Sequence, residues 1–182
     1  MTKQIKAFIS IAGLIVLLAV AVIAYNTLKA KYGQQLSQGE TEQAESAPDF
    51  TVYDDDGNAV NLSTFKGKPV VINFWASWCV YCDKEMPHFD ALAEEFKDKV
   101  EFVMINSTDG SKETKETAKQ YLTDNGYKFK PYFDTDLSAG TAFNIRGLPA
   151  SFFIDKDGNI VKKAFGMITE EKLREYVELI SK

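Results

Sequence analysis

The chain has 182 residues, of which 45% are apolar and 26% are charged, and its formal net charge is −5. Four of the 21 basic residues and none of the 26 acidic residues precede position 32, which leaves residues 32–182 with 17 basic and 26 acidic side chains, or −9. An acidic domain without a basic patch argues against nucleic acid as a partner. About 135 residues remain after the N-terminal segment, which fits one domain with one core.

The N-terminal segment contains an apolar run, residues 7–25, of 19 residues without a charge. A helix rises 1.5 Å per residue, so this run nearly spans the roughly 30 Å hydrocarbon core of a bilayer. We therefore predict that residues 1–30 form a membrane anchor with one transmembrane helix. The alternative is a cleaved signal peptide, but the apolar core of a signal peptide is usually only about 7–15 residues long. In both cases the rest of the chain is exported, and the anchor predicts a single-pass protein of the cell membrane.

The next segment, residues 31–47, is polar and rich in Gln, Ser, Glu and Gly, so we predict a linker. A folded domain is expected over residues 48–182. It opens with a β-hairpin whose strands are predicted at residues 50–53 and 60–62, on either side of an acidic turn. A short helical turn is expected at residues 63–65.

The middle of the chain begins with an unbroken apolar run at residues 70–75, which predicts a buried strand. A helix is predicted over residues 80–97, because apolar residues at positions 89, 92, 93 and 96 fall on one helical face. Pro87 lies inside this helix and is expected to kink it.

The remainder of the chain predicts further strands and helices in alternation. In order they are a strand at 100–106, a helix at 112–124, a strand at 129–133, a helix at 138–143, strands at 150–155 and 160–165, and a last helix capped by Thr169. This order predicts an α/β fold with a central sheet, helices on both faces, and a parallel, right-handed first β-α-β unit.

The only two cysteines, Cys79 and Cys82, stand at the start of the helix that follows the first buried strand. A helix N-terminus carries partial positive charge and free N–H groups, which stabilise a thiolate. We therefore predict that the Cys79 thiol has a lowered pKa and that its thiolate attacks disulfides. The less exposed Cys82 is predicted to resolve the mixed disulfide. The alternatives are a permanent disulfide, whose short loop would constrain the unfolded chain little, and a zinc site, to which only His88 could add a ligand. No cofactor is expected beyond a redox-active Cys79–Cys82 disulfide.

A carboxylate, Glu85, follows Cys82 by three residues and lies at the edge of the apolar helix face. Desolvation there would raise its pKa, so that Glu85 could accept the proton of Cys82 and return it. The alternative is an ordinary acid of the first turn, stabilised by the helix dipole.

Five motifs in this order resemble the thioredoxin superfamily, and within it the membrane-anchored TlpA/ResA-like thiol–disulfide oxidoreductases. They are APDF at 47–50, NFWASWC at 73–79, CDKEMP at 82–87, GLPASFFID at 147–155 and DG at 157–158. The resemblance covers residues 48–182 and implies a thioredoxin-like fold with an N-terminal β-hairpin and a central insertion. Thioredoxin has a buried Asp at the position of Asn73, whereas TlpA/ResA-like proteins resemble this chain in carrying a Glu at position 85, which favours Glu85 as the proton carrier.

The resemblance also implies a substrate groove, to which we assign Trp78, Tyr81, Leu148 and Pro149. The alternative for Trp78 is a packing role, which is the role predicted for Trp75. Pro149 resembles the cis-proline of the family; the alternative is a trans proline at the start of an edge strand. Leu148 stands where a small or β-branched residue is common, so it could alter which substrates fit. Tyr81 replaces a proline found in many relatives, and its ring could hold a partner.

The function implied is an extracytoplasmic thiol–disulfide oxidoreductase that reduces disulfides in exported proteins. The ResA branch suggests cytochrome c biogenesis, with apocytochrome c as one client. A membrane thiol–disulfide electron donor would re-reduce the protein. The alternatives are a dithiol oxidase that introduces disulfides, a non-catalytic protein-binding module and a peroxidase.

Overall fold

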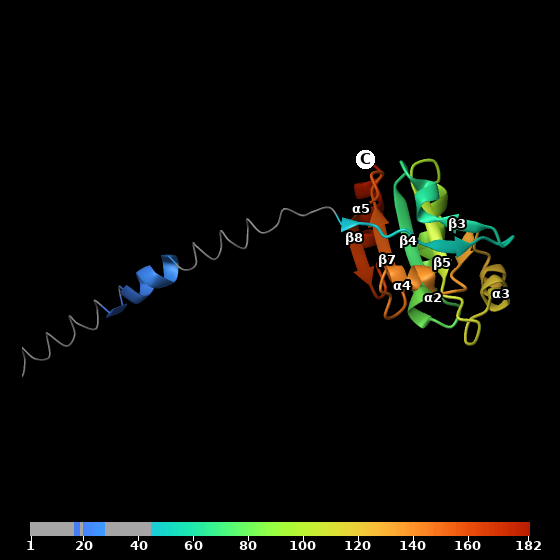
Figure 1. Cartoon of the computed structure of the whole chain (residues 1–182), viewed down its shortest axis with the longest axis horizontal. Helices are drawn as coiled ribbons and strands as arrows, with labels where there is room; N and C mark the ends of the chain where they lie inside the picture. Colours follow the sequence, from blue (N-terminus) through green and yellow to red (C-terminus); the bar gives the residue numbers. More distant parts are fainter. Residues whose placement is uncertain (1–16, 19, 28–44) are drawn as a thin grey trace, which may run out of the picture. The chain divides into compact units, whose positions relative to one another are not determined.

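The computed structural model describes residues 17–18, 20–27 and 45–182 (Figure 1). Residues 17–18 and 20–27 are helical and their side chains are exposed. Within the described ranges, no helix is long and apolar enough to cross a membrane. Most of the predicted anchor and linker, residues 1–16, 19 and 28–44, lies outside the described residues.

Residues 45–182 form an eight-stranded sheet in the order β1-β8-β7-β4-β5-β6-β2-β3 (Figure 1). The strands are β1 (Glu45–Ser46), β2 (Thr51–Tyr53), β3 (Ala59–Asn61), β4 (Val70–Trp75), β5 (Glu101–Asn106), β6 (Pro131–Phe133), β7 (Ala150–Ile154) and β8 (Asn159–Phe165). The helices are the 3-10 turn η1 (Leu62–Phe65), α2 (Val80–Glu95), α3 (Lys115–Asn125), α4 (Ser138–Ala142) and α5 (Glu170–Ile180). The predicted α/β class is confirmed.

The middle of the sheet is mixed, because β4 pairs in parallel with β5 and antiparallel with β7. Side chains along a strand alternate between the two faces. On β4, Val71 and Trp75 pack with residues of α2, α3 and α5, whereas Ile72 and Phe74 pack with residues of η1 and α4. Helices therefore cover both faces, as predicted, and Asn73 belongs to the face that carries α2.

Two boundaries differ from the predictions by more than two residues. Helix α3 begins at Lys115 rather than at residue 112, because Thr114 and Thr117 form a reciprocal cap at its N-terminus. Residues 45–46, which we assigned to the linker, pair with β8 as strand β1. The chain therefore joins the sheet a few residues before the predicted start of the domain.

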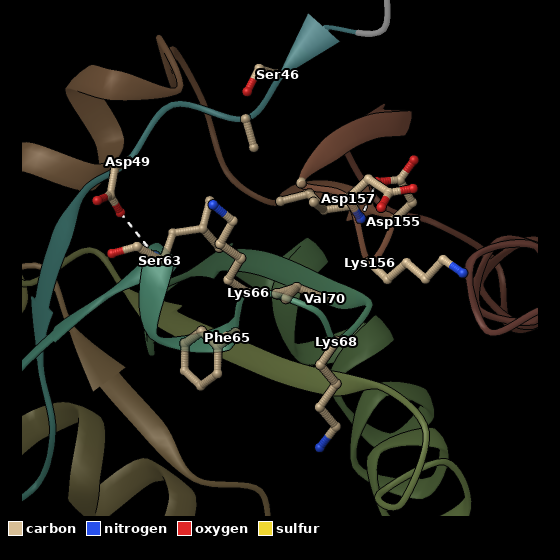
Figure 2. A pocket seen from close by; sticks show the side chains of 14 residues that line it. Ser46, Asp49, Ser63, Phe65, Lys66, Lys68, Val70, Asp155, Lys156 and Asp157 are labelled. Carbon is tan, nitrogen blue, oxygen red and sulfur yellow. Dashed lines mark hydrogen bonds between the residues drawn. The ribbon is translucent and has the colours of Figure 1, made fainter.

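The two ends of β4 face different surroundings. Its first residue, Val70, borders a pocket of about 210 Å³, which Figure 2 shows with Asp49 accepting a hydrogen bond from the backbone N–H of Ser63. Its last residue, Trp75, leads to Cys79. A strand of six residues is about 20 Å long, so this pocket lies at the end of the sheet away from the cysteines.

Candidate active site

The two cysteines are joined by a disulfide at the start of α2, with their Cα atoms 5.2 Å apart. The turn after β4 positions the first of them, because the Cys79 backbone N–H donates to the Ala76 carbonyl at 3.1 Å. Cys79 is the N-cap of α2. It is 6% exposed and Cys82 is 1% exposed, which confirms the predicted placement and the predicted order of exposure.

The sulfur of Cys79 accepts a hydrogen bond from the backbone N–H of Cys82 at 3.1 Å. A free N–H group of the helix N-terminus therefore points at this sulfur. Such donors stabilise a thiolate more than a thiol. In the reduced protein we expect this contact to lower the pKa of the Cys79 thiol.

Glu85 is buried on the same face of α2 as Cys82, with 1% of its surface exposed. Its Oε1 accepts a hydrogen bond from Nδ2 of Asn73 at 2.8 Å, and its Oε2 accepts one from the backbone N–H of Ile168 at 2.9 Å. Desolvation raises the pKa of Glu85 to about 7, and it outweighs these two hydrogen bonds, which lower the pKa. Glu85 is therefore not a solvated acid of the first turn, and its proton affinity suits exchange near neutral pH.

Asn73 links Glu85 to a residue that the sequence analysis did not identify, Ser151. The register pairs Asn73 on β4 with Ser151 on β7, and Nδ2 of Asn73 donates to Oγ of Ser151 at 3.0 Å. Ser151 is the one polar side chain of a strand that is otherwise apolar. That pattern could have marked it as a partner for another buried polar group.

The peptide bond between Leu148 and Pro149 is cis, as the resemblance implied. Pro149 directly precedes β7, whose first residue, Ala150, pairs with Phe74. Pro149 therefore lies at the end of the sheet from which β4 runs into Cys79. Leu148 is half-buried and packs against the hydrophobic clusters on both faces of the sheet.

The two aromatic residues of the motif are exposed, Trp78 by 44% and Tyr81 by 59%. Nζ of Lys112 lies 3.4 Å from the centroid of the Trp78 ring, and Nζ of Lys84 lies 5.5 Å from that of Tyr81. Both rings are thus available at the surface beside the cysteines, where a protein partner could contact them. Trp75, by contrast, is fully buried, as expected of a packing residue, and the exposed Trp78 does not fit that alternative.

A second buried carboxylate, Glu113, holds the turn before Cys79 and was missed by the sequence analysis. Its Oε1 accepts from the Ser77 backbone N–H at 2.9 Å and from Nδ2 of Asn106 at 2.7 Å. Its Oε2 accepts from Oγ of Ser77 at 2.6 Å. The sequence predicts Glu113 within the helix at 112–124, and no local pattern distinguishes it, because its partners come from two other parts of the chain.

The comparisons with known proteins agree with this geometry. The family described as Redoxin matches residues 42–180. The chain is 35% identical over 167 residues to "Thiol-disulfide oxidoreductase ResA" of Bacillus cereus, covering 88% of this chain and 94% of the relative. It is 33% identical over 182 residues to the ResA protein of Bacillus subtilis, covering 99% and 96%. Among solved structures, StoA from Bacillus subtilis superposes with a TM-score of 0.62 at 26% identity, covering 72% of this chain and 97% of that one.

Proposed function

We propose that this chain reduces disulfides in exported proteins. It belongs to the Redoxin family and is a thiol–disulfide oxidoreductase of the TlpA/ResA-like branch of the thioredoxin superfamily. One observation carries the proposal. The helix start that directs an N–H group at the sulfur of Cys79 also carries, one turn after Cys82, a buried carboxyl with a raised pKa.

The first step is attack by the Cys79 thiolate on one sulfur of a client disulfide. A bond forms between Cys79 and that sulfur, the client disulfide breaks, and the other client sulfur leaves as a thiolate. The N–H of Cys82 holds the attacking sulfur in its ionised form.

The second step releases the client. Cys82 gives its proton to the Glu85 carboxylate, and the Cys82 thiolate attacks Cys79, which forms the intramolecular disulfide and expels the second client sulfur. Glu85 then gives this proton to the client thiolate that has just been expelled. The proton that Cys79 lost before the first step protonates the client thiolate that left in that step. In total, two electrons and two protons pass from the dithiol to the client disulfide.

The client would lie across a surface formed by Trp78, Tyr81 and Leu148, next to the buried Pro149. The exposure of the two aromatic rings supports this assignment. Leu148 and Pro149 line a shallow hollow together with Phe165, whose ring is 69% exposed. These apolar side chains suit an unfolded or extended protein segment better than a small polar thiol.

The protein would work outside the cytoplasm, anchored by residues 7–25, and it needs a membrane dithiol donor for re-reduction. The uncharged apolar run supports the anchor. Apocytochrome c is the client class that the ResA resemblance suggests. A C-x-x-C pair outside the cytoplasm can persist in either redox state, so the donor decides the direction of exchange.

The experiment is to change Cys82 to Ser in the full-length chain and to trap covalent partners in cells. Exported proteins joined to Cys79 by a mixed disulfide would support the proposal, and a double variant that also carries Cys79→Ser is the control that should trap nothing. Equilibration of the wild-type protein with glutathione gives the direction. A potential near or below about −250 mV supports a reductant, and one near −120 mV would identify an oxidase instead.

A further inference from the structure

The side chains of Ser151, Asn73 and Glu85 form a short buried chain of hydrogen bonds on the α2 face of the sheet. Asn73 is its middle member and is 1% exposed. Both of its contacts are made by one atom, Nδ2, which donates to Oε1 of Glu85 at 2.8 Å and to Oγ of Ser151 at 3.0 Å. Among the residues that the structure describes, Oδ1 of Asn73 has no hydrogen-bond partner, although it is buried.

This arrangement serves the ionised form of Glu85. An amide nitrogen has only protons to offer, and a carboxylate oxygen can accept one of them. A protonated Glu85 has an O–H donor as well, and that donor needs an acceptor when it is buried. The amide nitrogen of Asn73 cannot be that acceptor.

A half-turn of the Asn73 amide exchanges the positions of Nδ2 and Oδ1 and reverses both hydrogen bonds. Oδ1 would then face Glu85 and Ser151, and its two lone pairs could accept from the O–H of each. The number of hydrogen bonds is two in either orientation, and the unpaired group of the amide is Oδ1 in one orientation and Nδ2 in the other. Oε2 of Glu85 keeps its contact with the backbone N–H of Ile168 throughout.

We propose that Asn73 is a positioning residue whose amide turns over when Glu85 gains or loses its proton, so that Ser151 and Asn73 together satisfy both protonation states of this carboxyl. The inference deepens the proposed function, because it describes how the buried proton carrier is supported during client release. When Cys82 gives its proton to Oε1 of Glu85, the amide turns its oxygen toward the new O–H. It turns back when that proton leaves.

A second pair in the same molecule lacks this freedom. Asn106 on β5 also donates through Nδ2 to a buried glutamate, Glu113, at 2.7 Å. Its Oδ1, however, accepts a hydrogen bond from Oγ1 of Thr108 at 2.8 Å. Turning the Asn106 amide would break contacts on both sides, so its orientation is held, and it provides an internal control.

The two helices near Glu85 carry many other titratable groups. Besides Glu85, α2 carries Tyr81, Cys82, Asp83, Lys84, His88, Asp90, Glu94 and Glu95, and α5 carries Glu170, Glu171, Lys172, Arg174, Glu175, Tyr176 and Glu178. Nδ1 of His88 lies 3.3 Å from a carboxylate oxygen of Glu170, so these two groups face each other. The neighbouring strands contribute only Asn73 and Ser151 to this network. In the part of the chain that the structure describes, no charged side chain contributes to the raised pKa of Glu85.

The test is a nuclear magnetic resonance titration of the oxidised full-length chain, in which the cysteines cannot ionise. The probes are the side-chain amide signals of asparagine and the carboxyl carbons of glutamate. We expect the Asn73 amide protons to lose their hydrogen-bonded shifts as Glu85 becomes protonated, with one shared midpoint. The Asn106 signals should stay unchanged in that pH range.

Two variants sharpen the result. In Glu85→Gln the Asn73 signals should no longer follow pH in this range, because nothing titrates there. In Ser151→Ala each orientation of the Asn73 amide loses one hydrogen bond, so we expect the protein to be less stable. The midpoint of the Glu85 titration should stay within about half a pH unit of its wild-type value, because both protonation states of Glu85 lose one hydrogen bond.

The inference is overturned if the carboxyl carbon of Glu85 titrates while the Asn73 amide signals remain fixed. It is also overturned if Ser151→Ala moves the midpoint by about one unit or more, as expected of an amide that serves only the ionised form. Both outcomes are distinct from a failure of the proposed function, which would appear as client release that does not depend on Glu85.

Discussion

Two buried glutamates flank the cysteine motif, and their surroundings differ. Glu85 lies on α2 and receives two donors, an asparagine amide and one backbone N–H. Glu113 lies in the loop before α3 and receives three, of which two come from Ser77 in the turn before Cys79. Both carboxyls pair with an asparagine of the central sheet, Asn73 or Asn106, so the asparagine alone does not distinguish them.

The difference lies in what each carboxyl holds. Glu113 ties the backbone and the hydroxyl of Ser77 to β5, so it fixes the shape of the active-site turn. Glu85 contacts no part of that turn through a hydrogen bond among the described residues, and burial raises its pKa to about 7. One glutamate therefore positions the nucleophile, and the other is suited to carry a proton.

The largest expected effect is that of Glu85→Gln on client release. This variant keeps the shape of the side chain but removes the proton acceptor, so formation of the Cys79–Cys82 disulfide from a mixed disulfide should slow by about 100-fold or more near pH 7. Rapid-mixing measurements with a preformed mixed disulfide would detect this. The matched control is Glu113→Gln, which should slow the step far less, and equal slowing in both would remove the distinction between the two glutamates.

The second effect is on stability as a function of pH. Burial raises the pKa of Glu85 from 4.5 to about 7, so the folded state holds its proton where the unfolded state has lost it. The stabilising contribution is fully present below about pH 4.5 and disappears as the pH rises through 7. Relative to Glu85→Gln, the oxidised wild-type protein should thus lose up to about 3 kcal/mol over this window. Urea unfolding at several pH values measures it, and a constant difference would show that Glu85 does not titrate there.

The third effect concerns the active-site turn. In Glu113→Gln one carboxylate oxygen is replaced by an amide nitrogen, so three donors compete for one oxygen. We expect a loss of about 1–3 kcal/mol in the free energy of unfolding, because a buried donor is left without an acceptor. Urea unfolding of the oxidised protein would measure this loss. The midpoint of the Glu85 titration should stay where it is; a shifted midpoint would mean that the two glutamates are coupled.

The smallest effect is expected for Thr108→Val, which removes the donor that fixes the Asn106 amide. The loss of one neutral hydrogen bond should cost about 1 kcal/mol of stability. The rate of client release should not change, since neither Cys82 nor Glu85 contacts this residue through a hydrogen bond in the described structure. A large change in that rate would show that the Glu113 side of the site takes part in proton transfer.

Most of the fold could be predicted from local pattern. The buried strand β4, the helix α2 and the Asp-Gly hairpin between β7 and β8 all lie within two residues of the predicted bounds. These elements have strong periodicity or a specific turn sequence. One error falls where a distant partner decides the outcome, because β1 is a strand only beside β8. The other, the start of α3, follows from the local cap of Thr114 and Thr117.

Local sequence patterns were enough to identify the chemistry. The motif consists of two cysteines after an apolar strand and a glutamate one helical turn later. It can be found from residue spacing alone, and spacing is a local property of the sequence. The tertiary structure alone decided how the carboxyls are supported. Asn73 and Ser151 are 78 residues apart in sequence yet directly paired across two strands, and Ser77 reaches Glu113 over 36 residues. Hydrogen bonds between such distant residues depend on strand register and loop packing, which no local pattern specifies.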